Sequence, residues 1–358
     1  MVAFSSLRFY TDARMRVLGL ETSCDETAAA VVELDLAASP PRGRALSDVV
    51  HTQAALHARF GGVVPELASR DHLQRALPVV DEALAEAGVQ LADLDGIAVT
   101  RGPGLIGALL VGVQVGRALA LGADKPLAMV NHLEGHLLAA LLSETPPAAP
   151  FLGLVVSGGH TSLYAVEAPG RYRILGHTLD DAAGEAFDKV AKLLGLPYPG
   201  GAHVDRLARG GDRTAFAFPR GLAKRRKDQF DFSFSGLKTA LLLHVQQHGV
   251  PDGRALADLC ASFQEAICDS LTIRAVRAAR AAGLTRLVLC GGVAANSRLR
   301  GLAQERCAAA GLELFLPAPK LCTDNGAMIA LAGGLRLARG ERWDERSGGP
   351  GADPGWRL

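Results

Sequence analysis

Aromatic residues, paired cysteines and net charge are all scarce in this chain of 358 residues. Aromatics make up 5% of the sequence, which argues against stacking platforms for single-stranded nucleic acid. The formal net charge is +1, so any contact with nucleic acid needs a local basic patch. The six cysteines are scattered without a C-x-x-C pair. This pattern indicates reduced thiols in a cytosolic protein rather than disulfides or a cysteine-bound zinc.

Long apolar runs are also missing. No uninterrupted apolar run approaches the roughly 18 residues that predict a transmembrane helix, so we expect no membrane span. Residues 1–14 lack the apolar core of a signal peptide and are interpreted as a loose N-terminal extension. We therefore expect a cytoplasmic protein without membrane contact. With 49% apolar residues, the chain is long enough for two domains and a large core.

The strongest chemical signal is a pair of histidines four residues apart, His132 and His136, in the run H-L-E-G-H. At 3.6 residues per turn their imidazoles lie about 40° apart on one side of a helix. That spacing suits one metal ion bound by two neutral nitrogens. For the pair alone, two unliganded histidines on a partly exposed helix are an equally good interpretation.

A zinc protease of the H-E-x-x-H type is the obvious rival interpretation. In that motif the glutamate directly follows the first histidine and lies near the metal. Here Glu134 lies midway between the two histidines, about 200° round the helix from the first. It is poorly placed to polarise a metal-bound water, so we discount the protease.

The order of strand and helix patterns indicates an internally duplicated α/β protein. A strand, a polar turn and a second strand open the chain over residues 16–34. The same layout returns over 152–166, after the proline-rich segment 145–150. Two such hairpins opening two halves predict two lobes with a cleft between them. The tail from residue 341 is rich in glycine, proline and charge, and we expect it to be loose.

Three polar turns are candidates for binding phosphate through backbone N–H groups: residues 21–27, 157–161 and 291–296. Alone each signal is weak, because such turns are common. The only concentrated basic run, 224–227, is by default a solvated loop, with phosphate or tRNA binding as the sharper alternative.

Several long segments, taken in order, match one known family. They are residues 19–27 (GLETSCDET), 64–70 (VPELASR), 132–136 (HLEGH), 156–161 (VSGGHT), 181–189 (DAAGEAFDK), 232–238 (FSFSGLK), 291–296 (GGVAAN) and 322–326 (CTDNG). On these residues the chain resembles the tRNA adenosine threonylcarbamoyltransferase family, TsaD, once called O-sialoglycoprotein endopeptidase, in its bacterial form. Beyond residue 340 only Trp356-Arg357 is similar to the family's ending.

The resemblance implies an α/β fold of the actin-like ATPase (ASKHA) type, with two lobes that each hold a mixed sheet flanked by helices. One lobe would comprise 15–131 plus about 325–340, and the other 132–324, with the active site in the cleft between them. The extension 1–14 and the tail 341–358 would flank this body.

The resemblance also implies a ligand set and a nucleotide site. A divalent metal, with Fe²⁺ favoured over Zn²⁺, would be held by His132, His136 and Asp324. An adenylate or ATP would lie on a second set of residues, namely Val155, Val156, Ser157, Gly158, Gly159, Asp188, Gly201 and Asn296. In the plain structural interpretation, Asp188 pairs or caps on its own helix, Gly201 only turns the chain, and Asn296 caps the following helix.

The implied reaction transfers the threonylcarbamoyl group from threonylcarbamoyl-AMP to N6 of adenosine 37, in tRNAs that read codons beginning with A. The implied partners are tRNA, a paralogous subunit (TsaB) and a small ATPase (TsaE). No Ser–His or Cys–His pairing stands out, which favours direct attack by the adenine amine. Asp25 and Glu26 are candidates for a proton relay. The alternatives are an actin-like ATPase or kinase, and a scaffold subunit without transferase activity.

Overall fold

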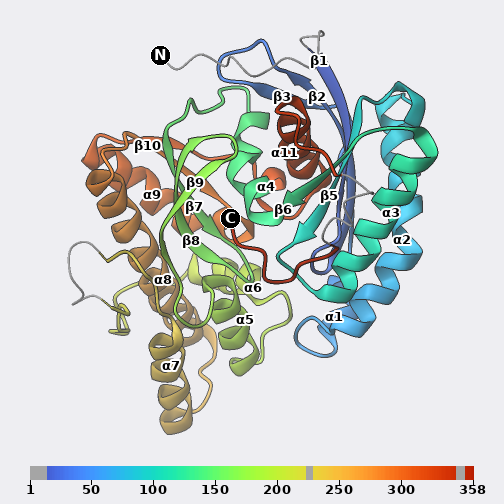
Figure 1. The fold of residues 1–358 in the computed structure, drawn as a ribbon. Helices are drawn as coiled ribbons and strands as arrows, with labels where there is room; N and C mark the ends of the chain where they lie inside the picture. Colours follow the sequence, from blue (N-terminus) through green and yellow to red (C-terminus); the bar gives the residue numbers. More distant parts are fainter. Residues whose placement is uncertain (1–13, 223–228, 344–350) are drawn as a thin grey trace. The chain divides into compact units, whose positions relative to one another are not determined.

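The computed structural model of the chain describes residues 14–222, 229–343 and 351–358 (Figure 1). It divides into two compact units. Unit 1 comprises Met1–Ala55, Val63–Ala148 and Asp324–Leu358, and unit 2 comprises Leu56–Gly62 and Ala149–Thr323. The expected lobe boundary at 131/132 differs from this division, because the segment with both histidines and Asp324 fall in unit 1. The basic run 224–227 and residues 1–13 of the expected extension lie outside the described residues.

Unit 1 is built on a mixed sheet with the strand order β3-β2-β1-β5-β6, in which β4 also pairs with β2. Its strands are β1 (Arg14–Glu21), β2 (Glu26–Asp35), β3 (Arg42–Ala45), β4 (Val49–Thr52), β5 (Gly96–Gly102) and β6 (Leu127–Asn131). The β1–β2 pair is antiparallel, whereas β5 runs parallel to both β1 and β6. The carboxyl ends of β1, β5 and β6 therefore meet at one edge of the sheet.

Helices cover both faces of this sheet. They are α2 (Pro65–Ala87), α3 (Ile106–Ala123), α4 (His132–Leu138) and α11 (Gly326–Ala338), with the short η1 (Leu91–Asp93) and η2 (Ala139–Leu142). In β1, Met15 and Val17 pack with α11, while Leu18 and Leu20 pack with α2 and α3. This alternation is the period of two that a strand buried on both faces requires. Figure 1 shows α2 and α3 on one side of the sheet and α4 and α11 on the other.

By length and composition alone, α3 is apolar enough to cross a membrane, although Gln114 and Arg117 interrupt its apolar run. In the structure a third of that stretch is buried. Gly112 and Gly116 bring α3 against Thr22 and Val99 of its own unit. The core helix of a globular unit passes the same test.

Unit 2 holds a second mixed sheet, in the order β11-β10-β7-β8-β9. Its strands are β7 (Phe151–Val156), β8 (Thr161–Ala168), β9 (Arg171–His177), β10 (Arg286–Cys290) and β11 (Glu313–Phe315). Its helices are α5 (Ala183–Leu193), α6 (Gly200–Ala208), α7 (Ser235–His248), α8 (Gly253–Ala281), α9 (Ser297–Ala310), α10 (Pro319–Cys322) and η3 (Gly292–Ala295); α1 (Ala54–Ala58) falls at the boundary between the units. The two predicted hairpins are confirmed as β1–β2 and β7–β8.

Three features of the chain differ from the sequence predictions. Strand β9 and helix α6 were not predicted: β9 is largely exposed and polar, and α6 begins with two glycines that usually indicate a turn. The prediction of a loose tail is wrong for residues 351–358. There the Asp353 backbone N–H donates to the Arg101 carbonyl at 2.9 Å.

Close packing of β1 on α11 predicts the effect of one substitution. A Cβ at Gly19 would lie 2.3 Å from both the Ala330 nitrogen and the Gly326 oxygen. We expect Gly19→Ala to lower the free energy of unfolding by about 3 kcal/mol, because the backbones must separate. Gly122→Ala is the matched control: it lies in α3 with open space around it, and we expect a gain of up to about 1 kcal/mol. Denaturant unfolding followed by circular dichroism measures both; equal effects would contradict this packing argument.

Candidate metal centre and glycine-rich loop

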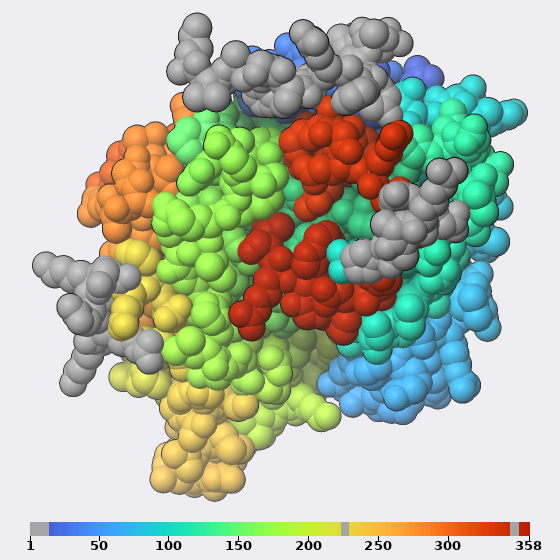
Figure 2. Space-filling view, viewed as in Figure 1, coloured from blue at the N-terminus to red at the C-terminus, as the bar shows by residue number. Residues whose placement is uncertain are grey.

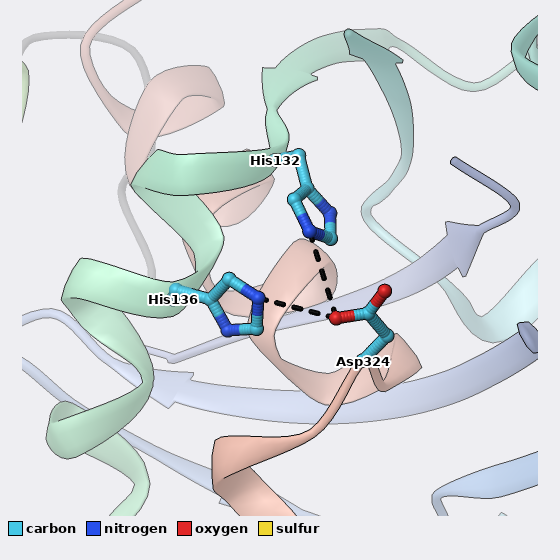
Figure 3. Close-up of side chains that lie close together, drawn as sticks. All are labelled: His132, His136 and Asp324. Carbon is cyan, nitrogen blue, oxygen red and sulfur yellow. Dashed lines mark ion pairs between the residues drawn. The ribbon is translucent and has the colours of Figure 1, made fainter. Parts of the chain in front are cut away.

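Helix α4 begins where β6 ends, and its cap orients the two histidines. The Asn131 side-chain carbonyl accepts a hydrogen bond from the Leu133 backbone N–H at 2.9 Å, which is a standard helix N-cap. His132 is the first helical residue, and His136 lies one turn later on the same face. Figure 3 shows both rings facing Asp324.

Asp324 reaches these rings from the segment that precedes α11. The Asn325 side chain accepts from the Met328 backbone N–H at 2.8 Å, which fixes the start of α11 next to Asp324. The Asp324 Oδ1 atom lies 3.5 Å from His132 Nε2 and 3.2 Å from His136 Nε2. One ligand atom from each of the three residues lies within 4.8 Å of the others. The structure thus brings together the three residues that the resemblance implied.

The polar atoms of His136 indicate that this site accommodates a cation. The side chain is fully buried, yet neither ring nitrogen has a hydrogen-bond partner among the described residues. A buried polar group without a partner costs roughly 1–3 kcal/mol. A metal ion bound to a ring nitrogen would remove part of this cost. Two imidazoles and one carboxylate also form a ligand set suited to Zn²⁺ or Fe²⁺ with coordination positions left open.

Glu21, the last residue of β1, holds His132 from behind. Its Oε2 atom accepts a hydrogen bond from His132 Nδ1 at 3.0 Å and from the Thr100 hydroxyl at 2.6 Å. The Ser23 backbone N–H donates to Oε1 of the same carboxylate. A proton held at Nδ1 leaves Nε2 as the ring nitrogen available on the Asp324 side.

Glu21 was missed in the sequence analysis, although a carboxylate directly after an apolar strand is a usable signal. The Ser23 hydroxyl also lies 3.2 Å from His132 Nδ1, a Ser–His contact that the sequence did not reveal. Since Nδ1 donates its proton to Glu21, His132 cannot take the proton of Ser23 at that nitrogen. The contact therefore does not form a nucleophile and base pair.

The charges around His132 produce a negative site. Burial lowers the pKa of His132, but the nearby carboxylates of Asp324 and Glu21 outweigh burial and raise it to about 9. Burial raises the pKa of Glu21, and the interaction with His132 more than reverses this effect. The pKa of Glu26 is raised well above its ordinary value by burial and by the charges of Asp25 and Asp324. Such a concentration of buried carboxylates favours a positive ligand.

Glu134 faces away from this cluster, as its place in the helix predicts. Its Oε2 atom accepts from Arg336 Nε at 2.6 Å, and the glutamate side chain is fully buried. It therefore serves as an ion-pair partner between α4 and α11, which is not the role of a protease base.

In unit 2, residues 155–159 of the predicted nucleotide set lie at the end of β7 and directly after it. Val155 and Val156 are fully buried strand residues, so only their backbones are candidates for ligand contact. The carbonyls of Ser157 and Gly158 accept hydrogen bonds from the first N–H groups of α5 at 3.2 and 3.1 Å. Gly159 follows at the exposed turn.

The remaining predicted residues in unit 2 have structural partners of their own. Asp188 Oδ1 accepts from the Gly200 backbone N–H at 2.8 Å and so joins α5 to the start of α6. Asn296 caps α9 by accepting from the Leu299 N–H at 3.0 Å, and it donates to Gln264 at 2.7 Å. The plain structural roles considered for Asp188 and Asn296 are therefore present. The Asn296 carbonyl also accepts from the Cys268 thiol at 3.9 Å, and its amide carries a second N–H beyond the bond to Gln264.

Three glycines of this region border open space. A Cβ built at Gly158 or Gly159 meets no atom within 4 Å, and one at Gly201 meets only the Phe187 Cβ at 3.8 Å. None of the three has the positive φ that favours glycine. Neither internal packing nor backbone strain therefore requires glycine at these three positions, and each leaves room for close approach of a ligand.

The family model described as TsaD, tRNA N6-adenosine threonylcarbamoyltransferase, matches residues 44–331. The chain belongs to the TsaD family. Its activity is accordingly that of a transferase that modifies N6 of a tRNA adenosine with a threonylcarbamoyl group. Neither an ATPase or kinase nor an inactive scaffold is favoured.

Curated TsaD relatives match almost the whole chain. A tRNA N6-adenosine threonylcarbamoyltransferase of Anaeromyxobacter sp. (strain Fw109-5) is 63% identical over 345 residues, which cover 96% of this chain and 100% of the relative. One of Sorangium cellulosum (strain So ce56) is 57% identical over 339 residues, covering 92% of this chain and 93% of the relative.

Solved structures support the fold. Full-length HypF, in a phosphate- and nucleotide-bound form, superposes with a TM-score of 0.58 at 12% identity over 91% of this chain. HypF of T. kodakarensis superposes with a TM-score of 0.59 at 14% identity, also over 91% of this chain. The chain spans 46% and 48% of the length of these two proteins, so the likeness concerns the fold alone. It confirms the actin-like class, with two sheets flanked by helices.

The hydrogen bond behind His132 gives a test of this TsaD site. We expect Glu21→Gln to weaken the affinity of the chain for Zn²⁺ by roughly 10–100-fold, the usual cost of losing a partner that orients a metal ligand. Glu33→Gln is the control, since Glu33 pairs with arginines at the surface of the same sheet. Competition with a chromogenic chelator measures both affinities. Equal affinities for Glu21→Gln and the wild type would show that Glu21 does not orient His132.

Proposed function

We propose that this chain transfers the threonylcarbamoyl group from threonylcarbamoyl-AMP to N6 of adenosine 37, in tRNAs that read codons beginning with A. A divalent metal is held by His132, His136 and Asp324. The observation that carries the metal site is the pair of buried imidazoles directed at one carboxylate. Within residues 14–222, 229–343 and 351–358 the ring nitrogens of His136 have no hydrogen-bond partner.

The ligand set suits a borderline-hard divalent ion. Zn²⁺ accepts two imidazole nitrogens and one carboxylate, and the same set with open positions also suits Fe²⁺. The resemblance to the family favours Fe²⁺. When bound, the metal supplies positive charge that stabilises negative charge on a substrate oxygen.

The adenylate binds on residues 155–159 of unit 2, with Asp188, Gly201 and Asn296 around it. The open faces of Gly158, Gly159 and Gly201 support this assignment, because a phosphate or carboxylate can approach a backbone that lacks Cβ atoms. HypF, which shares the fold, was solved with phosphate and nucleotide bound.

The transfer is a direct displacement. The N6 amine attacks the carbamoyl carbon, the bond from that carbon to the phosphate oxygen breaks, and AMP leaves with the bonding pair while N6 loses one proton. AMP is a good leaving group, so the protein contributes mainly positioning and electrostatic stabilisation. We place the reaction in the cytoplasm, with a paralogous TsaB-type subunit and a TsaE-type ATPase as partners.

Loss of a metal ligand provides the first test. Reconstitution of the chain with both partner proteins, threonylcarbamoyl-AMP and an unmodified tRNA should yield the modified nucleoside, detected by mass. His136→Ala should lower both the bound metal per chain and the rate of transfer at least 100-fold, because transition-state charge loses its stabiliser. His248→Ala, an exposed histidine of α7, is the control. Full activity of His136→Ala without bound metal would contradict the proposal.

Blocking the glycine-rich turn provides the second test. Gly159→Val adds side-chain atoms where the structure shows open space. We expect the dissociation constant for the adenylate to rise at least tenfold, about 1.4 kcal/mol, with little change in thermal stability. Gly301→Val on α9, also bordered by open space, should leave adenylate binding unchanged. Calorimetric titration with AMP measures this, and wild-type affinity in Gly159→Val would place the nucleotide elsewhere.

A further inference from the structure

The C-terminal segment 351–358 packs on unit 1 beside the helix that carries both histidines. We propose that this segment positions helix α4 for metal binding and that Trp356 is its main positioning residue, an inference that rests on the proposed metal site. The residues near the C-terminus are red in Figure 2, and Figure 1 shows the chain end passing by β5 and β6. Three contacts connect the segment to the surroundings of the metal ligands.

The first contact holds the end of β5. The Arg101 carbonyl accepts from the Asp353 N–H at 2.9 Å, and Arg101 Nε donates to the Gly351 carbonyl at 2.9 Å. The Arg101 guanidinium also lies 4.7 Å from the centre of the Trp356 ring. A Cβ at Gly102 would lie 1.8 Å from the Asp353 carbonyl oxygen. Only glycine therefore leaves room for the segment at this position. Thr100, the residue before Arg101, donates a hydrogen bond to Glu21, the buried carboxylate that accepts from His132.

The second contact holds the cap of α4. Asn131 Nδ2 donates to the Trp356 carbonyl at 3.1 Å, while Oδ1 of the same amide accepts from the Leu133 N–H. Both ends of the capping amide are therefore fixed, one by the tail and one by the helix. The first helical residue after this cap is His132.

The third contact reaches the middle of α4. The Trp356 ring lies 5.5 Å from the Arg336 guanidinium, whose Nε donates to Glu134 at 2.6 Å. Glu134 is fully buried and lies between the two histidines in sequence. A cation over an aromatic ring is attracted to it, so the Trp356 ring stabilises both Arg101 and Arg336 in place. One side chain thus contacts the residues that fix both β5 and α4.

The test measures Zn²⁺ affinity of the full chain by chelator competition for the wild type, Trp356→Ala and Trp356→Phe. Outer partners of a metal site typically contribute 10–100-fold to affinity, and Trp356 lies one contact further out. We therefore expect Trp356→Ala to weaken Zn²⁺ binding about fivefold to tenfold. Trp356→Phe keeps an aromatic face and should bind nearly as the wild type does.

The control is Trp343→Ala. The Trp343 ring lies in the same unit, 4.4 Å from the Arg117 guanidinium, and the Trp343 backbone N–H donates to the Leu127 carbonyl at the opposite end of β6. This variant should lose thermal stability and keep its Zn²⁺ affinity. If Trp356→Ala and Trp343→Ala weaken Zn²⁺ binding equally, the segment only stabilises the unit and the inference is overturned. The inference is also overturned if Trp356→Ala keeps the Zn²⁺ affinity of the wild type.

Two further outcomes are distinguishable. If Trp356→Ala does not fold, a second variant tests the same segment. Asp353→Ala removes the ion pair to Arg101 at 3.6 Å and the hydrogen bond from the Gly355 N–H at 3.1 Å. It should still weaken Zn²⁺ binding at least twofold, and unchanged affinity overturns the inference. If the wild type binds no Zn²⁺, or His132→Ala binds it as tightly, the proposed metal site itself fails.

Discussion

The burial of two imidazoles against one carboxylate is the constraint on which the organisation of unit 1 depends. Burying polar groups is costly unless each is paired or bound to an ion. His132 has Glu21 on one side and Asp324 on the other. His136 faces the same Asp324 carboxylate at 3.2 Å, but its ring nitrogens make no hydrogen bond in the part of the chain that the structure describes. A cation held by all three residues satisfies this arrangement.

The sheet of unit 1 explains how residues so far apart in sequence reach one point. Parallel pairing aligns the ends of β1, β5 and β6, which place Glu21, Thr100 and the cap of α4 at one edge. Packing of α11 on the same sheet then brings in Asp324. The ligands are therefore fixed by the same contacts that form the core, which is the arrangement that a precise metal site needs.

Local sequence patterns predicted much of the fold and part of the candidate site. The hairpins, the long helices and the spacing of His132 and His136 follow from short-range periodicity, so they could be predicted. The role of Glu21 could not be predicted, because its contact with His132 joins residues 111 positions apart and forms only when the strands pair. The order of the tail 351–358 was also unpredictable, because its composition is that of a loop and its partners Arg101 and Arg336 lie far away in sequence. Asp324 as a ligand came from family resemblance, not from any local pattern.

The family and the geometry answer different questions. Relatives at 63% identity identify the transferred group and the tRNA acceptor, while the side chains form a group that could hold a cation. The most direct test of this account is anomalous diffraction from crystals of the metal-loaded chain, collected at the absorption edge of the metal. The account predicts a peak about 2.0–2.2 Å from His132 Nε2, a ring nitrogen of His136 and an oxygen of Asp324. A metal peak away from these three residues, or none in a chain that retains its activity, would contradict it.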